Sequence, residues 1–257
     1  MKRGIVVGLF LTALVAPLAG CGGSAADTAS GASPNAGGQA TSKSSPAAKP
    51  EDVLKGAAAK LTGKSVRFTV DDGTDSSSGI YDAASGASKL TATVDGSKMD
   101  VIGKGNDVYI GGLDPSGKWM KADATKFTGS GVSFLTTADP LFAVKYLATA
   151  ANVKQDQPSA YSGTIDLSKV TGTDTAKRIA GAFAKSAGSS ATALPFTATL
   201  DATGGLATLT VTFPKADLGG KDFKYDLKVL SVGGAETVTV PAKNTTTEAP
   251  SDLYKGP

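Results

Sequence analysis

The chain has no histidine in its 257 residues. Without histidine, Ser-His-Asp and Cys-His nucleophilic sites and histidine-ligated zinc sites are excluded. The chain also has no Ser-x-x-Lys motif and no complete Gly-x-x-x-x-Gly-Lys-Ser/Thr phosphate loop. Acid–base catalysis by paired carboxylates stays open, but no Asp or Glu pair stands out from solvated turn residues. We therefore expect a protein that is not an enzyme and that needs no cofactor.

Cysteine is nearly absent too, because Cys21 is the only one. The folded part of the chain can form no disulfide, so we expect core burial alone to stabilise it. Strong charge of either sign is also missing. Removal of residues 1–20 would take away Lys2 and Arg3 and leave 24 basic against 23 acidic residues. This balance gives no reason to expect a nucleic-acid partner.

No hydrophobic run is long enough to span a bilayer comfortably. The apolar stretch from Ile5 to Leu18 follows the basic pair Lys2-Arg3 and ends in Leu18-Ala19-Gly20-Cys21. This order is typical of a bacterial lipoprotein signal peptide, residues 1–20, with Cys21 as the lipidated residue. We expect the mature protein to be lipid-anchored at the extracytoplasmic face of the cell membrane.

The residues after Cys21 divide into three parts. Residues 21–50 form a Ser/Ala/Gly/Pro-rich linker without a large apolar side chain, and a coil of this length spans about 30 Å. Residues 51–241 form one domain, and the polar tail 242–257 is expected to fray.

The first half of the domain predicts one helix followed by a meander. A helix should begin at Pro50 and stop at Gly63, and from Ser65 the apolar residues alternate as in a strand. Turns are predicted at Asp71-Asp72-Gly73, at the Ser76–Gly79 run and at Asp95-Gly96, with short strands between them.

The second half predicts more helix. Asp139 should cap a helix that starts at Pro140 and runs to about Ala151, and residues 161–170 should form a strand. A further helix is expected over residues 173–187. Four closing strands are expected over residues 196–200, 206–213, 223–232 and 236–240.

One pattern resembles a calcium loop, with Asp71, Asp75 and Asp82 at positions 1, 5 and 12. Position 3 is Gly73, which has no side-chain ligand, and position 6 is Ser76 instead of the glycine that the bend requires. We therefore interpret these aspartates as turn residues and expect no metal.

These elements predict an α+β fold, in which a curved antiparallel sheet of about ten strands forms a half-open barrel with helices on its concave face. The sheet is wider than three alanine-rich helices can cover, so the concave face should hold either a filled core or a ligand cavity. The residues expected to line it are Phe68, Val70, Leu90, Ala92, Val94, Val101, Leu141, Val144, Leu147, Ile165, Leu167, Ile179, Ala180, Phe183, Phe196, Val211 and Phe213.

The order of these pieces resembles a known family. The lipobox and linker are followed by a short helix, the strand Ser65–Thr69 and a long meander that contains Val108–Ile110 and Lys118–Lys121. After the meander come a helix at Asp139-Pro140, residues 161–166, another helix and a closing hairpin over residues 200–211. In this order the chain is similar to the actinobacterial LppX/LprAFG lipoproteins, which look like relatives of the LolA/LolB carriers. The resemblance implies a half-open barrel that binds or carries acylated lipids or glycolipids across the cell envelope.

A different class stays open beside the carrier. The same fold could be a tethered, non-catalytic interaction or sensory module that docks a membrane protein, such as a transporter. A contiguous exposed apolar patch would favour docking, whereas a deep apolar cavity would favour the carrier. In both cases we expect a monomer.

Overall fold

The computed structural model describes residues 48–71, 76–94, 97–114, 116–128, 133–171, 174–214 and 222–255. All of them belong to one compact unit, Pro46–Pro257. The signal segment, Cys21 and almost all of the linker lie outside the described residues. No helix in these ranges is both long and apolar enough to cross a membrane.

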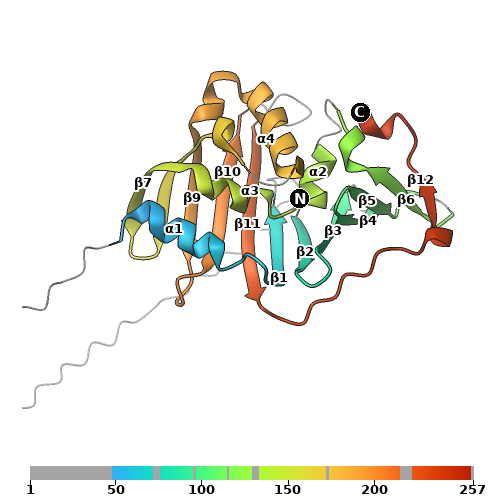
Figure 1. Cartoon of the computed structure of the whole chain (residues 1–257), viewed down its shortest axis with the longest axis horizontal. Helices are drawn as coiled ribbons and strands as arrows, with labels where there is room; N and C mark the ends of the chain where they lie inside the picture. Colours follow the sequence, from blue (N-terminus) through green and yellow to red (C-terminus); the bar gives the residue numbers. More distant parts are fainter. Residues whose placement is uncertain are drawn as a thin grey trace, which may run out of the picture. The chain divides into compact units, whose positions relative to one another are not determined.

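Within the described residues, twelve strands form one sheet made of two consecutive meanders (Figure 1). The N-terminal meander consists of β1 (Val66–Asp71), β2 (Ser76–Asp82), β3 (Ala87–Val94), β4 (Ser97–Lys104), β5 (Asp107–Gly111) and β6 (Trp119–Asp123). The C-terminal meander consists of β7 (Ala150–Gln157), β8 (Ala160–Ile165), β9 (Leu194–Leu200), β10 (Leu206–Phe213) and β11 (Phe223–Val232). The last strand, β12 (Thr246–Glu248), pairs in parallel with β6.

The two meanders join through β1 and β11, which pair antiparallel from Val66–Val232 to Asp71–Asp226. The sheet order is β12-β6-β5-β4-β3-β2-β1-β11-β10-β9-β8-β7. The edge strands β12 and β7 do not pair with each other among the described residues, so the sheet stays open. The predicted α+β class, with a curved open sheet and helices on its concave face, is confirmed, although with twelve strands in place of about ten.

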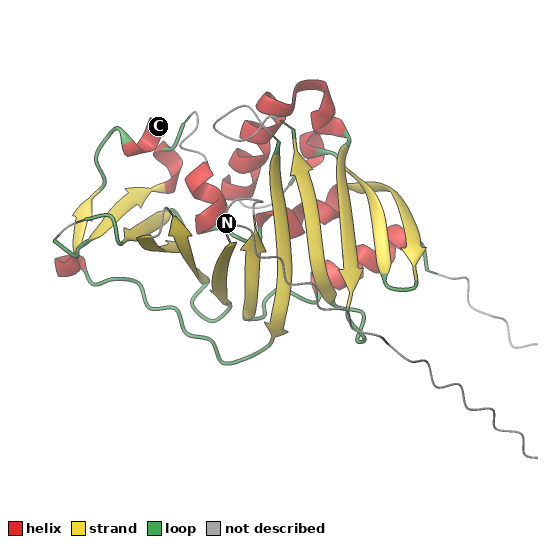
Figure 2. Cartoon of the chain, turned by 180° about the vertical axis from the view of Figure 1, so that it is seen from behind, coloured by secondary structure: helices red, strands yellow, loops and turns green. Residues whose placement is uncertain are grey.

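The α-helices α1 (Pro50–Ala59), α2 (Ser133–Ala138), α3 (Phe142–Tyr146) and α4 (Asp174–Ala187) lie on one face of the sheet (Figures 1 and 2). α1 begins with proline at its first position, carries two acids in its first turn and buries Leu54 and Ala57, as its spacing predicts. α1 packs on β7 and β10, α2 packs on β3 and β4, and α3 packs on β10. Each meander therefore receives its own helices.

Strand burial follows the alternation that the sequence predicts. In β10 every second side chain from Leu209 to Phe213 is buried. In β3 and β4 both faces are partly buried, because Ala87 and Ile102 belong to a second cluster. The helix-facing side chains form one large core. A smaller cluster on the opposite face contains Ala87, Ile102, Tyr109 and Val238.

One predicted turn and one predicted strand differ from the structure. The Ser76–Gly79 run is the first half of β2 and not a turn. A Cβ at Gly79 would collide with the ring of Phe68, so this glycine gives the ring room inside a regular strand. The predicted strand 161–170 ends at Ile165. Asp166 then accepts from the Ser168 amide at 3.0 Å and starts a short 3-10 turn.

The helix predicted from Pro140 to about Ala151 is also wrong in its bounds. α2 comes before it and was not predicted, α3 ends at Tyr146, and Ala150 already begins β7. Asp139 does not cap α3, whose N-cap is Leu141 without a side-chain bond. The Asp139 carboxylate binds Lys145 instead.

The C-terminal region differs most from the prediction. Residues 236–240 are extended but form no ladder with the sheet. They cross its outer face, where the Val238 amide donates to Asp82 Oδ2 at 3.2 Å. The tail that was expected to fray forms β12, and the Tyr254 ring contacts Phe127 with centroids 5.2 Å apart. The C-terminal residues thus add an edge strand to the sheet and cover part of the outer face of the N-terminal meander.

Candidate functional site

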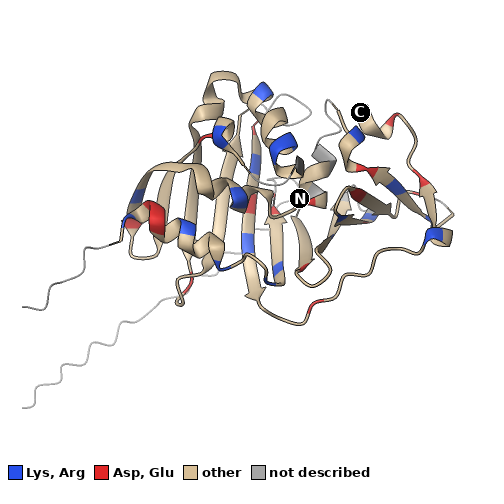
Figure 3. Cartoon of the chain, in the orientation of Figure 1, with Lys and Arg blue, Asp and Glu red and all other residues tan. Residues whose placement is uncertain are grey.

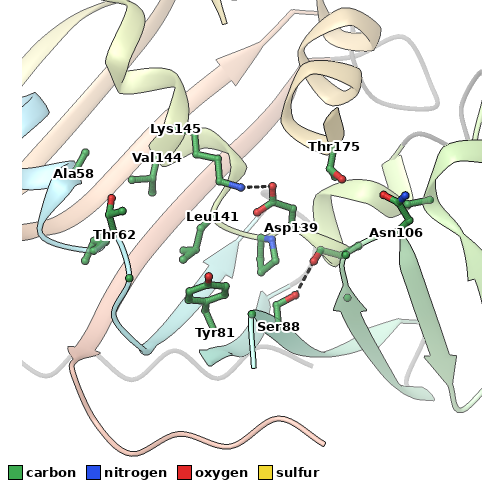
Figure 4. A pocket seen from close by; sticks show the side chains of 18 residues that line it. Ala58, Thr62, Tyr81, Ser88, Asn106, Asp139, Leu141, Val144, Lys145 and Thr175 are labelled. Atoms are coloured by element: carbon green, nitrogen blue, oxygen red, sulfur yellow. Dashed lines mark hydrogen bonds and ion pairs between the residues drawn. The ribbon is translucent and has the colours of Figure 1, made fainter. Parts of the chain in front are cut away.

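A pocket of about 410 Å³ opens on the helix-bearing face of the N-terminal meander (Figure 4). Its walls come from the end of α1, from β2 to β4, from the α2–α3 connection and from the start of α4. The lining residues are Ala58, Leu61, Thr62, Gly63, Tyr81, Gly86, Ser88, Gly103, Gly105, Asn106, Ala124, Ala138, Asp139, Pro140, Leu141, Val144, Lys145 and Thr175.

The floor of the pocket exists because two inward-facing positions carry small residues. Leu90 and Val101 are cross-strand partners and fill the space above the sheet. Two residues further along, the next inward pair is Ser88 and Gly103. This step from a large pair to a small pair removes most of the side-chain volume, so the C-terminal end of α2 lies directly against β3 and β4 and backbone lines part of the pocket floor.

The roof is the α2–α3 connection, which hydrogen bonds hold at both ends. Ser88 Oγ donates to the Ala138 carbonyl at 2.6 Å, and the Tyr225 hydroxyl donates to the Pro140 carbonyl. Burial raises the pKa of Tyr225 well above 10, so this phenol stays a donor. A Cβ at Gly103 would collide with the Ala138 carbonyl, which shows how closely α2 approaches the sheet.

Asp139 and Lys145 are the charged residues of the lining, and they pair with each other. Lys145 Nζ lies 2.5 Å from Asp139 Oδ2, and Figure 4 shows this pair beside the pocket. The Lys145 side chain is 36% exposed and the Asp139 side chain is 19% exposed, so water screens their charges only in part. Elsewhere basic and acidic residues are interspersed along the described ribbon (Figure 3).

Most residues of the predicted cavity set lie in the packed core and not in this pocket. Leu141 and Val144 line it, while the other members that the structure describes do not. Val70 is half-buried, and the side chain of Val94 lies outside the described residues. The rest of the predicted set is buried.

The reason is an aromatic cluster that fills the concave face of the C-terminal meander. The rings of Phe183 and Phe213 lie 4.2 Å apart between centroids, and those of Phe142 and Tyr225 lie 4.8 Å apart. Phe223 contacts the same cluster at 5.6 Å from Phe183. Of the two alternatives that the sequence leaves open, the filled core holds here.

Sequence reasoning missed most of the pocket because it searched for large apolar residues. Small residues at inward-facing strand positions, such as Ser88 and Gly103, were the sequence feature that could have indicated the pocket. Asp139 lies in the α2–α3 connection and Lys145 in α3, and the helix predicted from Pro140 to about Ala151 gave no sign that these two residues pair beside a pocket.

The calcium-like pattern has other partners in the structure. Asp75 lies outside the described residues. Asp82 accepts hydrogen bonds from the Ser85 hydroxyl and from the Ala84 and Val238 amides. The Ser85 hydroxyl contributes most to lowering the pKa of this carboxyl below 3.8. Asp82 thus fastens a turn and the C-terminal segment.

No family model and no curated protein matches the sequence. Several solved structures match the chain, among them two MucB complexes at low similarity. MucB in complex with MucA(peri) is 12% identical, with a TM-score of 0.30 over 76% of this chain and 58% of that one. The MucA/MucB complex of Pseudomonas aeruginosa is 15% identical, with a TM-score of 0.30 over 77% of this chain and 60% of that one. The chain thus spans less than two thirds of either neighbour, and at these scores neither indicates a ligand or partner.

Proposed function

We propose that this chain is a membrane-anchored extracytoplasmic lipoprotein that binds an acylated ligand in the pocket above β2 to β4. Three features support the proposal: the lipobox that ends at Cys21, the linker that follows it, and the partly apolar hollow in the folded unit. The resemblance to the LppX/LprAFG lipoproteins agrees with it.

The pocket is the observation that carries the proposal. Its volume of about 410 Å³ falls in the lower part of the range of small-molecule sites, about 300–1,000 Å³. Ala58, Leu61, Leu141 and Val144 give it apolar walls, while Ser88, Asn106 and Thr175 add neutral polar groups. Apolar walls with a few polar groups suit an amphiphile better than a fully polar metabolite.

The size of the pocket sets the expected affinity. Each buried methylene contributes about 0.8 kcal/mol, so about ten of them contribute about 8 kcal/mol. Alone, that would correspond to a dissociation constant of about 1 μM, but the entropic cost of association, at least about 4 kcal/mol, weakens it toward about 1 mM. Binding of this kind is readily reversible, as a carrier requires.

The docking alternative has less support in the described residues. Their large exposed apolar side chains are Leu113, on the β5–β6 connection, and Leu230 and Val232, on β11. Leu230 and Val232 lie two residues apart on one strand and Leu113 lies on a separate connection, and a few exposed apolar residues of this kind are normal on a protein surface.

A pocket-filling substitution tests ligand binding. Ala58→Trp should fill the apolar wall at the end of α1, so a fluorescent acyl ester should bind residues 22–257 of the variant at least about tenfold more weakly. Ala59→Trp is the matched control, because Ala59 is exposed on the same helix and outside the pocket lining. Wild-type protein that does not bind the ester, or equal losses in both variants, would refute the proposal.

The anchor needs a separate test in cells. Cys21→Ser removes the thiol that would carry the diacylglycerol, so we expect unprocessed or mislocalised precursor in fractionation and in mass spectrometry. A variant that is processed and sediments with membranes like the wild type would show that Cys21 is not the anchor. Cys21→Ala serves as a second variant that also lacks the thiol.

A further inference from the structure

The charges of the pocket bear on the ligand's head group. Asp139 and Lys145 are one acid and one base among eighteen lining residues, and the other sixteen are neutral. Lys145 Nζ lies 2.5 Å from Asp139 Oδ2, and this ion pair is the interaction that each side chain makes. The lining therefore has no net charge.

An ionised head group of one sign would meet a conflict in this pocket. An anion that approaches Lys145 also approaches Asp139, and its binding would take away the partner of a half-buried carboxylate. A cation meets the same difficulty with Lys145. Because these side chains are only partly screened by water, the like-charge repulsion is larger than it would be at an open surface.

A head group of zero net charge avoids this conflict. A neutral one can hydrogen-bond to the hydroxyls and amide that line the pocket, such as those of Asn106 and Thr175, and leaves the ion pair intact (Figure 4). A zwitterion can offer one charge to each partner of the pair.

The volume restricts the apolar part in the same way. The pocket holds about 410 Å³, and the concave face of the adjacent meander is filled by the cluster around Phe142 and Phe213. Space for a second or third acyl chain would require that cluster to open, with the loss of its packing.

We propose that the pocket selects amphiphiles that have a single acyl chain and a head group without net charge. This inference rests on the proposed function, and it concerns the specificity of the same site. It makes Asp139 and Lys145 the residues that determine head-group selection, and they act together as a pair.

The test compares four amphiphiles of equal chain length as competitors of the fluorescent acyl ester, each below its micellar concentration. They are a monoacylglycerol, a lysophosphatidylcholine, a lysophosphatidic acid and an alkyl trimethylammonium. The first two should displace the ester at concentrations at least about tenfold lower than the last two. A diacylglycerol with the same chains should compete less well than the monoacylglycerol.

Two substitutions should shift this selectivity in opposite directions. Asp139→Asn leaves Lys145 unpaired, so the affinity for lysophosphatidic acid should rise about tenfold while that for the monoacylglycerol changes little. Lys145→Met should raise the affinity for the alkyl trimethylammonium instead. Thermal melting of each variant shows whether it is folded.

The control variants repeat the same charge changes away from the pocket. Lys224 and Asp226 form an ion pair on β11 at 2.8 Å, and neither lines the pocket. Asp226→Asn and Lys224→Met should therefore leave the order of the four competitors unchanged.

The outcomes separate the inference from the proposed function. If lysophosphatidic acid competes as well as the monoacylglycerol, or if Asp226→Asn shifts selectivity as much as Asp139→Asn does, the inference is overturned while acyl binding stands. If the ester itself does not bind the wild type, both fall.

Discussion

The two meanders of the sheet treat their helix-facing sides differently. In the C-terminal meander, Phe213 and Tyr225 meet Phe142 and Phe183 from the helices above, and their rings fill the space. In the N-terminal meander, the inward pair is Ser88 and Gly103, and the Ala138 carbonyl of α2 rests against it beside the pocket. Both meanders use antiparallel pairing, although β8 and β9 are joined through α4. Large inward rings thus accompany the filled half, and a small inward pair accompanies the half that holds the pocket.

Truncation of a ring in the filled half should have the largest effect. Phe213 is fully buried, so Phe213→Ala should lower the free energy of unfolding by about 3–5 kcal/mol in urea denaturation. Leu141→Ala, at the pocket wall, should cost about 2 kcal/mol, because part of its surroundings is already empty. Equal losses would show that the two halves are packed alike.

Added bulk should separate the two halves in the opposite sense. Ala180 is a buried residue of α4 that packs in the core, so Ala180→Trp should overpack the core and cost about 1–3 kcal/mol. Ala58→Trp can extend into the pocket and should change stability by less than about 0.5 kcal/mol. A large loss of stability with Ala58→Trp would mean that the pocket cannot accept an added side chain.

The smallest effect should come from a glycine that does not make room for a neighbouring ring or backbone group. Gly181 is exposed within α4, and a Cβ there would meet no atom within 4 Å. Gly181→Ala should therefore stabilise the protein by about 0.5–1 kcal/mol in thermal or urea unfolding. Gly103→Ala is the contrasting variant and should destabilise, because its methyl group would collide with the Ala138 carbonyl. If both glycines tolerate alanine, α2 does not rest on β4 as described.

Periodicity predicted the elements well where one face is buried over several residues. α1, α4, β10 and β11 are near their predicted bounds, because their apolar spacing matches a helix or a strand throughout. It failed where tertiary contacts decide the outcome. Residues 236–240 alternate like a strand, yet Val238 packs against the outer face and its amide binds Asp82.

The candidate site was harder to predict than the fold. A list of apolar residues describes a core and a cavity wall equally well, so Phe68 and Leu141 looked alike in the sequence although only Leu141 reaches the pocket. The hollow depends on what is missing at Ser88 and Gly103, and on a connection whose position is set by Tyr225 from a distant strand. Sequence spacing does not encode such long-range contacts.

The pairing of β1 with β11 has a consequence for how this chain folds. Within each meander most neighbouring strands close short loops, with α4 between β8 and β9 as the exception, whereas the Val66–Val232 contact closes almost the whole folded unit. Such a contact must overcome the entropy of a long loop and forms slowly. We expect each meander to assemble early and the two to join in the rate-limiting step. An exported chain would then expose the unpaired edges of β1 and β11 until its last strands have crossed the membrane, and during that interval it would be most open to aggregation and proteolysis.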